Sequence, residues 1–170
     1  IDAHPQCELG PITARADAGR RLSDLYPHHR VDRVLEELDT GGAHGDVDAA
    51  IVGYPHAASA PLVKELRDRG VRVIDLSADF RLKDLATYEQ YYGPHPAPEL
   101  IADAVYGLPE LYREQIRSAD LVAGPGCYPT AAIVALDPLG PLGALDDVVI
   151  DAKSGVSGAG RAATETTHFS

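Results

Sequence analysis

The chain has 170 residues, of which 45% are hydrophobic and 24% are charged, which is enough apolar material to bury the core of one domain or of parts of two. Its 15 Lys and Arg residues against 26 Asp and Glu residues give a formal net charge of -11. So acidic a protein is excluded as a binder of the nucleic-acid backbone or of an anionic membrane surface.

Further classes of protein are excluded by what the sequence lacks. Its two cysteines, Cys7 and Cys127, are too few for a disulfide framework, and we expect both thiols to be reduced, as in a cytoplasmic protein. No apolar run approaches the roughly 20 residues that cross a bilayer. Cys and His residues do not recur at metal-ligand spacing, so we expect no metal site. The sequence contains no methionine, and we expect it to be a piece of a longer protein.

The first 45 residues carry one helical pattern between their glycines and prolines. Apolar residues at positions 31, 34, 35 and 38 are spaced by three and four, as on one face of a helix. The pattern predicts helical structure within residues 19–38.

The clearest pattern is a strand, a helix and a second strand in succession. A short apolar run within residues 48–55 predicts a buried strand that ends at a Gly-Tyr-Pro turn. An amphipathic stripe then predicts a helix over residues 57–69, which Gly70 ends. Residues 71–75 are again apolar and predict the next strand. Such a unit joins parallel strands by a right-handed crossover.

Two more strands are predicted in the second half of the chain, at residues 120–123 and 148–152, with a helix at residues 130–136 between them. The connection at residues 77–118 is rich in Tyr, Pro and His, and a connection of this length is usually functional or a small subdomain. The predicted fold class is therefore α/β, with a mostly parallel sheet. Ligands of such sheets bind at the carboxyl ends of the strands.

Three segments leave predicted strands at that edge, at residues 53–56, 76–79 and 124–127. The histidines His56 and His95 lie in loops on or near it. We expect the functional site to be built from these segments.

Cys127 is the best candidate for chemistry. It lies in a Gly-Pro-Gly-Cys-Tyr-Pro-Thr segment, after a strand and at the start of a helix. Gly126 before it lets the backbone turn sharply and lets a substrate come close. The N-terminus of a helix favours the thiolate form of cysteine, and backbone N–H groups there can hold an oxyanion. The alternative is that Cys127 is a small buried apolar residue, which remains the interpretation for Cys7.

Two other segments carry polar groups suited to binding. Residues 154–161 read Ser-Gly-Val-Ser-Gly-Ala-Gly-Arg, a donor-rich loop in which Arg161 is suited to hold an anion; the alternative is a surface turn. Asp75, Asp79 and Arg81 surround a strand end, where a salt bridge or a helix cap is the default interpretation.

The segment around Cys127 resembles the active site of the N-acetyl-gamma-glutamyl-phosphate reductases, which belong to the semialdehyde dehydrogenase family. The resemblance continues, in order, through residues 73–82, 91–93, 106–111 and 154–161. These reductases usually have Asn where Gly124 stands. The resemblance implies a Rossmann-type domain over residues 1–126, with its first βα unit missing, followed at residues 127–170 by the start of a second α/β domain for catalysis and dimerisation.

What the resemblance implies is the NADPH-dependent reduction of N-acetyl-L-glutamyl 5-phosphate to the 5-semialdehyde and phosphate, in arginine biosynthesis. Cys127 would attack the acyl phosphate and hold the acyl group as a thioester. Gly126, Ser154 and Arg161 would bind the substrate and its phosphate. The full-length protein would be a homo-oligomer. The family's dinucleotide-binding glycine loop and catalytic histidine would fall outside this sequence, so we expect the chain alone to be inactive.

The same resemblance implies which residues bind the cofactor NADP(H). Arg15 and Arg20 lie in the region that would bind the ribose 2'-phosphate. Pro55 and His56 would lie near the nicotinamide. A further set would close on the cofactor: Ser157, Gly158 and Ala159.

Several alternatives remain open at the level of the sequence. The related aminoadipyl-phosphate reductase of lysine biosynthesis acts on a substrate one methylene longer, which a pocket discriminates by only about 1–3 kcal/mol. Aspartate-semialdehyde dehydrogenase is a more distant candidate, since it lacks the Cys-Tyr-Pro-Thr pattern. The chain could also be a non-catalytic Rossmann-type binding module, in which the thiol of Cys127 would be alkylated at the rate of an ordinary cysteine. A cysteine hydrolase is a further alternative, and it would need neither nicotinamide nor phosphate.

Overall fold

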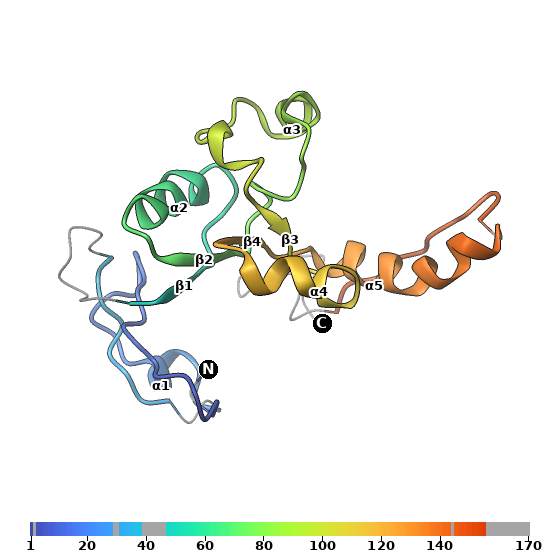
Figure 1. Ribbon diagram of the computed structural model, residues 1–170. Helices are drawn as coiled ribbons and strands as arrows, with labels where there is room; N and C mark the ends of the chain where they lie inside the picture. The colour runs from blue at the N-terminus through green and yellow to red at the C-terminus, as the bar shows by residue number, and fades with distance from the viewer. Residues whose placement is uncertain (2, 29–30, 39–46, 144, 156–170) are drawn as a thin grey trace.

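A computed structural model describes residues 1, 3–28, 31–38, 47–143 and 145–155 of the chain. Its centre is a four-stranded sheet in the order β1-β2-β4-β3, and every neighbouring pair is parallel. Helices flank this sheet, so the predicted α/β class with a parallel sheet is confirmed (Figure 1). None of the helices in the described ranges is long and apolar enough to cross a membrane.

The predicted strand–helix–strand unit forms the first half of the sheet. It comprises β1 (Ala49–Val52), α2 (Ser59–Asp68) and β2 (Arg72–Asp75). The helix ends in a Schellman motif, in which Gly70, at φ +80°, donates to the carbonyl oxygen of Arg67 and Val71 donates to that of Leu66. Glycine suits this position because it adopts a left-handed backbone without a steric penalty.

The core lies between α2 and the sheet. Side chains alternate between the two faces of each strand, so one face of β1 and β2 is turned toward α2. This face buries Val52 and Val73 against Ala60 and Val63 of α2. The side chains of the other face are exposed, including Ile51 and Ile74, which are aligned across the two strands.

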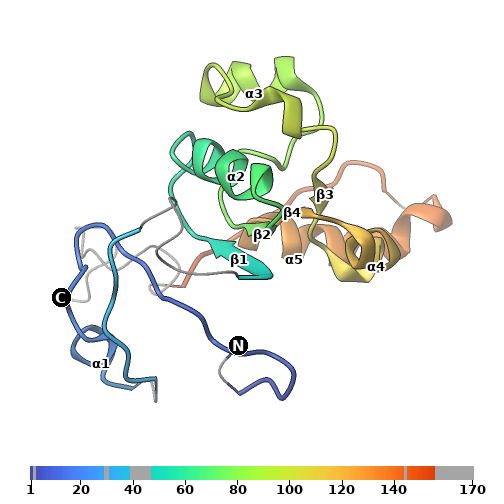
Figure 2. The same cartoon turned by 60° about the vertical axis from the view of Figure 1, so that its left-hand side comes forward.

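The second half of the sheet runs from β3 (Val105–Tyr106) through α4 (Pro109–Ser118) to β4 (Leu121–Ala123). Because β4 lies between β2 and β3, the crossover from β3 through α4 to β4 runs back toward β2. The crossover through α2 runs from β1 to β2, in the opposite direction along the sheet. Since both crossovers are right-handed, α2 and α4 lie on opposite faces. Figures 1 and 2 show α4 on the side of the sheet opposite α2 and α3.

The long connection after β2 folds into an insertion of its own. It contains α3 (Leu85–Tyr92) and the 3-10 helix η1 (Pro98–Leu100). Asp84 caps α3 by accepting from the backbone N–H and the hydroxyl of Thr87, at 2.8 and 2.5 Å. These hydrogen bonds hold the pKa of the Asp84 carboxyl below its usual value. The connection at residues 77–118 is thus structured, but neither the strand β3 nor the helix α4 within it was predicted.

The helix predicted within residues 19–38 is wrong for most of that range. The only α-helix found among its described residues is α1 (Leu22–Leu25), a single turn that ends before Pro27. Residues 33–36 are extended and bond to the earlier chain. Leu35 donates to the carbonyl oxygen of Arg20 at 2.8 Å, and Glu36 donates to that of Ile12 at 2.9 Å. Pairing with earlier backbone has overridden the helical spacing of the side chains.

The strand predicted at residues 148–152 is also wrong. These residues are extended but pair with no other strand in the described part of the chain, and their apolar side chains are exposed, Val149 by 91%. They follow α5 (Cys127–Leu136) and the 3-10 helix η2 (Asp137–Leu142), which extend away from the sheet in Figure 1. An apolar run forms a strand only where a neighbour supplies its hydrogen bonds.

Candidate functional site

The loops after β1, β2 and β4 meet at the carboxyl edge of the sheet, as predicted. Backbone hydrogen bonds tie them together: Leu76 donates to the carbonyl oxygen of Val52 at 2.9 Å, and Gly124 donates to that of Asp75 at 2.7 Å. Gly124 is closely packed, since a Cβ there would lie 3.1 Å from Leu76 Cδ2 and 3.2 Å from the Asp75 carbonyl oxygen. Each loop therefore has a fixed position relative to the next.

A buried carboxylate anchors α2 to the end of β2. Asp75 is fully buried, and its Oδ1 and Oδ2 accept from the hydroxyls of Ser59 and Ser77 respectively, each at 2.5 Å. Asp79, the second carboxylate of this segment, is also fully buried and accepts from the backbone N–H groups of Ala57 and Ala60 at 2.8 and 2.9 Å. The prediction of a helix cap at this strand end is confirmed, because Asp79 satisfies N–H groups at the start of α2.

Arg81 bonds to backbone and not to either of these carboxylates. Its Nε donates to the carbonyl oxygen of Gly124 at 2.7 Å, and its Nη2 donates to that of Leu76 at 2.8 Å. Its Nη1 lies 3.3 Å from the position that a Cβ on Gly126 would occupy. A fixed positive charge therefore lies beside the turn that leads into α5. The sequence showed a guanidinium near this strand end, but not that it reaches the turn after β4.

Cys127 is exposed and is the first residue of α5. Gly126 is the N-cap in an extended conformation, and its carbonyl oxygen accepts from both the backbone N–H and the hydroxyl of Thr130, at 3.0 and 2.9 Å. Pro129 has no N–H, so the first-turn donors without an acceptor inside the helix belong to Cys127 and Tyr128. The geometry presents an accessible thiol, two backbone donors and a nearby guanidinium. This confirms the predicted strand–turn–helix setting and contradicts the alternative of a buried apolar cysteine. The same interpretation of Cys7 is also wrong, because Cys7 is exposed.

The segment before β1 brings Arg15 to Tyr54, in the loop that follows β1. Its guanidinium lies over the ring of Tyr54, 5.0 Å from the ring centroid. Both residues line a cavity of about 270 Å³, with the remaining lining residues Thr13, Ala14, Ile51 and Gly53. The hydroxyl of Tyr54 is buried and has no hydrogen-bond partner in the described structure. The sequence placed Tyr54 in the segment at residues 53–56 of the predicted edge, but it gave no sign that this hydroxyl lines a cavity with Arg15.

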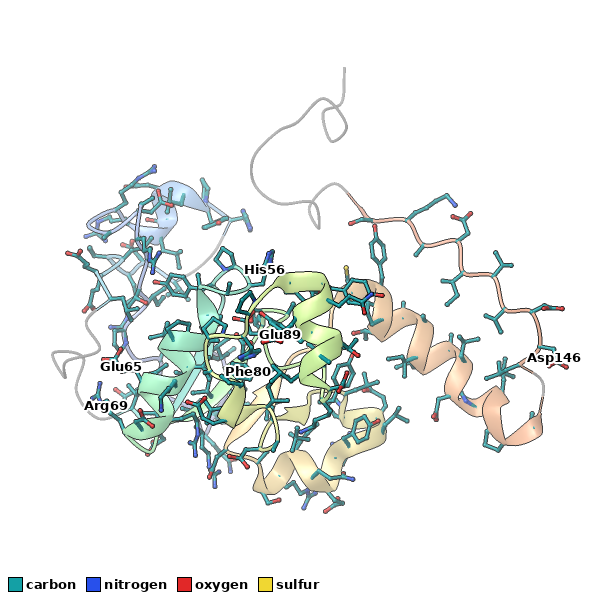
Figure 3. The ribbon with its side chains drawn as sticks, turned by 90° about the horizontal axis from the view of Figure 1, so that it is seen from above. His56, Glu65, Arg69, Phe80, Glu89 and Asp146 are labelled. Carbon is teal, nitrogen blue, oxygen red and sulfur yellow. The ribbon has the colours of Figure 1, made fainter. Side chains whose placement is uncertain are left out.

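The other predicted cofactor residues lie apart from that cavity's lining. Arg20 is exposed and pairs with Asp17 at 2.9 Å. The carbonyl oxygen of Pro55 accepts from Ala58 and Ser59 N–H at the start of α2. His56 is exposed at the edge, and its ring lies 5.4 Å from that of Tyr92 (Figure 3).

The predicted residues of the loop at residues 154–161 are described only in part. Ser154 is exposed, and its hydroxyl donates to the carbonyl oxygen of Gly155 at 3.1 Å. The residues Ser157, Gly158, Ala159 and Arg161 lie outside the described part of the chain.

His95 is buried and has a structural role. It accepts at Nδ1 from the N–H of Ala97, so its Nε2 donates to the carbonyl oxygen of Asp79 at 2.7 Å.

A larger cavity of about 620 Å³ lies at the opposite edge of the sheet, beside residues 69–72. None of its lining residues is a predicted catalytic, substrate-binding or cofactor-binding residue.

Comparison with known proteins agrees with this geometry. Residues 1–119 match the model of the semialdehyde dehydrogenase NAD-binding domain. The chain belongs to the semialdehyde dehydrogenase family. Residues 127–170 match the dimerisation domain of the same family, and this match starts at the nucleophile candidate Cys127. The cofactor of the first domain is a nicotinamide dinucleotide.

Curated relatives share a more specific name. A Rhodopirellula baltica protein named N-acetyl-gamma-glutamyl-phosphate reductase is 51% identical to this chain over 93% of its length. A Syntrophobacter fumaroxidans protein of the same name is 47% identical over 99% of the chain. A Dehalococcoides mccartyi protein of that name is 49% identical over 99% of the chain. The chain spans about half the length of these relatives: 47%, 50% and 49% respectively.

Solved structures support the fold. Aspartate semialdehyde dehydrogenase II from Vibrio cholerae, in its complex with ASA, matches 81% of this chain and 38% of its own with a TM-score of 0.53 at 22% identity. A second structure of that protein gives a TM-score of 0.54 at 21% identity, with 81% of this chain and 35% of its own covered. This similarity supports the Rossmann-type arrangement of the sheet.

Proposed function

We propose that the protein containing this chain reduces N-acetyl-L-glutamyl 5-phosphate to N-acetyl-L-glutamate 5-semialdehyde and phosphate, with NADPH, in arginine biosynthesis. The observation that carries the proposal is the exposed thiol of Cys127 at the first residue of α5, with Arg81 beside the preceding turn. The shared name of the relatives supports the choice of substrate.

Cys127 is the nucleophile of the proposed reaction. Its thiolate attacks the acyl carbon, the bond from that carbon to the phosphate oxygen breaks, and phosphate leaves with the electron pair. The N–H groups of Cys127 and Tyr128 stabilise the oxyanion that forms during this attack. The acyl group remains on Cys127 as a thioester. A bound nicotinamide cofactor would supply the hydride that takes the thioester to the level of the aldehyde, with Cys127 as the leaving thiolate.

The phosphate needs positive charge and donors close to Cys127. Arg81 is the described guanidinium placed at the turn before α5, and the glycine at position 126 keeps the approach to Cys127 free of a side chain. Ser154 and Arg161 complete the proposed phosphate and substrate site from the loop that follows Asp151 and Lys153.

The residues around the end of β1 fit a nicotinamide dinucleotide. The unpartnered hydroxyl of Tyr54 and the guanidinium of Arg15 border one cavity at the carboxyl edge, where such ligands bind. We assign Arg15, together with Arg20, to the ribose 2'-phosphate, which makes NADP(H) the preferred cofactor. Pro55 and His56 would lie near the nicotinamide.

Ser157, Gly158 and Ala159 would complete the cofactor site. We also propose that residues 1–126 act as the NADP-binding domain and residues 127–170 as the start of the catalytic and dimerisation domain, and that the full-length protein is a homo-oligomer. The match to the NAD-binding domain ends at residue 119 and the match to the dimerisation domain begins at residue 127, which supports this division.

The test is phosphate-dependent formation of NADPH from NADP and N-acetyl-glutamate semialdehyde by the full-length protein. Cys127→Ser should abolish this activity, whereas the matched variant Cys7→Ser, also of an exposed cysteine, should leave it unchanged. Activity that survives Cys127→Ser would contradict the mechanism. Turnover of the aminoadipate semialdehyde in place of the glutamate semialdehyde would contradict the substrate.

A further inference from the structure

We propose that Asp79 and Tyr88 form a positioning pair, in which Tyr88 of α3 holds the Asp79 carboxylate and Asp79 in turn holds the loop after β1 in the shape that binds the cofactor. The inference rests on the proposed function, because it assigns a purpose to the loop at residues 53–57. Both side chains are fully buried, so neither contacts a ligand directly.

The loop after β1 contains a backbone conformation that needs support. Ala57 has φ +63°, in the left-handed region that residues other than glycine rarely adopt. Its N–H donates to Oδ1 of Asp79 at 2.8 Å. His56 directly precedes this residue, so the direction in which the loop presents His56 depends on the hydrogen bond to Asp79.

The Asp79 carboxylate accepts hydrogen bonds from three donors that come from different segments. Ala57 and Ala60 donate from the loop and from α2, and the hydroxyl of Tyr88 donates to the same Oδ1 at 2.9 Å. Tyr88 is the side-chain donor among these, and it belongs to the insertion rather than to the sheet. Removing its hydroxyl leaves a buried carboxylate with one donor fewer, which weakens its hold on the loop.

The insertion also contacts the loop through stacked rings. Tyr88 and Tyr92 stack with centroids 5.0 Å apart, and Tyr92 contacts His56 at 5.4 Å. Figure 3 shows His56 and Glu89 close together in projection, with the helix that carries Glu89 beside the loop. The helix therefore supports the loop at two points, through Asp79 and through Tyr92.

The experiment compares Tyr88→Phe with Tyr91→Phe in the full-length protein. Both remove one hydroxyl from α3, but Tyr91 is 71% exposed and serves as the matched control. Two quantities are measured: the KM for NADPH, and the burst of phosphate from N-acetyl-glutamyl phosphate without nucleotide, which reports the attack by Cys127.

We expect Tyr88→Phe to raise the KM for NADPH at least fivefold while the burst rate stays within twofold of the wild type. Asp79→Asn should raise the KM further; if this variant fails to fold, Tyr88→Phe alone decides. The proposal would be overturned if Tyr88→Phe lowered the burst rate by the same factor by which it raised the KM. It would also be overturned if Tyr88→Phe and Tyr91→Phe had the same KM for NADPH. A burst that persists in Cys127→Ser would instead overturn the proposed function, so the two failures are distinguishable.

Discussion

Arg81 donates from Nε to the carbonyl oxygen of Gly124 at 2.7 Å, across 43 positions of the sequence. The same guanidinium donates to the carbonyl oxygen of Leu76 at 2.8 Å, so one side chain joins the loops that follow the neighbouring strands β2 and β4. The turn that presents Cys127 is therefore held by a planar group with donors in a fixed arrangement.

Arg81→Lys should lower kcat/KM by about 100-fold, because a single ammonium cannot reproduce the forked bonding and the turn before α5 would shift. The measurement is phosphate-dependent activity of the full-length protein, with Arg113→Lys on the exposed side of α4 as the control. Wild-type activity in Arg81→Lys would show that charge alone is sufficient at this position.

Arg15→Ala should raise the KM for NADPH by roughly 10- to 100-fold, the cost of a lost charged hydrogen bond to a phosphate, and should change the KM for NADH little. Arg20→Ala should have a smaller effect, because Asp17 already holds that guanidinium. Steady-state kinetics with both nucleotides tests this. Equal changes for NADPH and NADH would remove Arg15 from the 2'-phosphate site.

The stability of the chain should fall at alkaline pH through Tyr88. Burial raises the pKa of its phenol above the ordinary value of 10.0, and the hydrogen bond to Asp79 adds to the effect. The unfolded chain therefore loses this proton first. Above about pH 10 the free energy of unfolding should decrease by up to about 1.4 kcal/mol per pH unit from this group. Urea unfolding between pH 8 and about 11 should show a shallower decline in Tyr88→Phe than in Tyr91→Phe.

Gly107→Ala should destabilise the fold by about 1–3 kcal/mol, through overpacking at the end of β3. A Cβ at this position would lie 2.9 Å from Val122 Cγ1 and 3.1 Å from the carbonyl oxygen of Ala123, and the backbone atom cannot move aside cheaply. Gly155→Ala is the control, since no atom of the described residues lies within 4 Å of its added Cβ. Equal urea midpoints for the two variants would contradict the prediction.

The sequence predicted the elements whose signals are local. The β1–α2–β2 unit follows from an apolar run, an amphipathic stripe and a glycine cap, each of which acts within a few residues. The strand β3 has two residues, too few to show a period. Residues 31–38 show a helical spacing, yet they bond to residues 12–22, a partner that no local pattern reveals.

The site divides in the same way. Cys127 could be found because a strand, a glycine turn and a helix start coincide in sequence. That Arg81 bonds to Gly124 rather than to Asp75 or Asp79 could not be predicted, since its partners are backbone carbonyls far along the chain. The hydrogen bond from Ala57 to Asp79 is equally non-local, and it becomes visible only with the backbone angle at Ala57.

α5 carries the proposed nucleophile at its first residue, yet none of its ten residues is buried in this chain. An isolated helix of this length is only marginally stable in water, so most of its order must come from packing on another surface. Amide protons of α5 should thus exchange with deuterium much faster than those of α2, until a surface covers them. The order of the helix that presents Cys127 would then depend on the surface that covers α5.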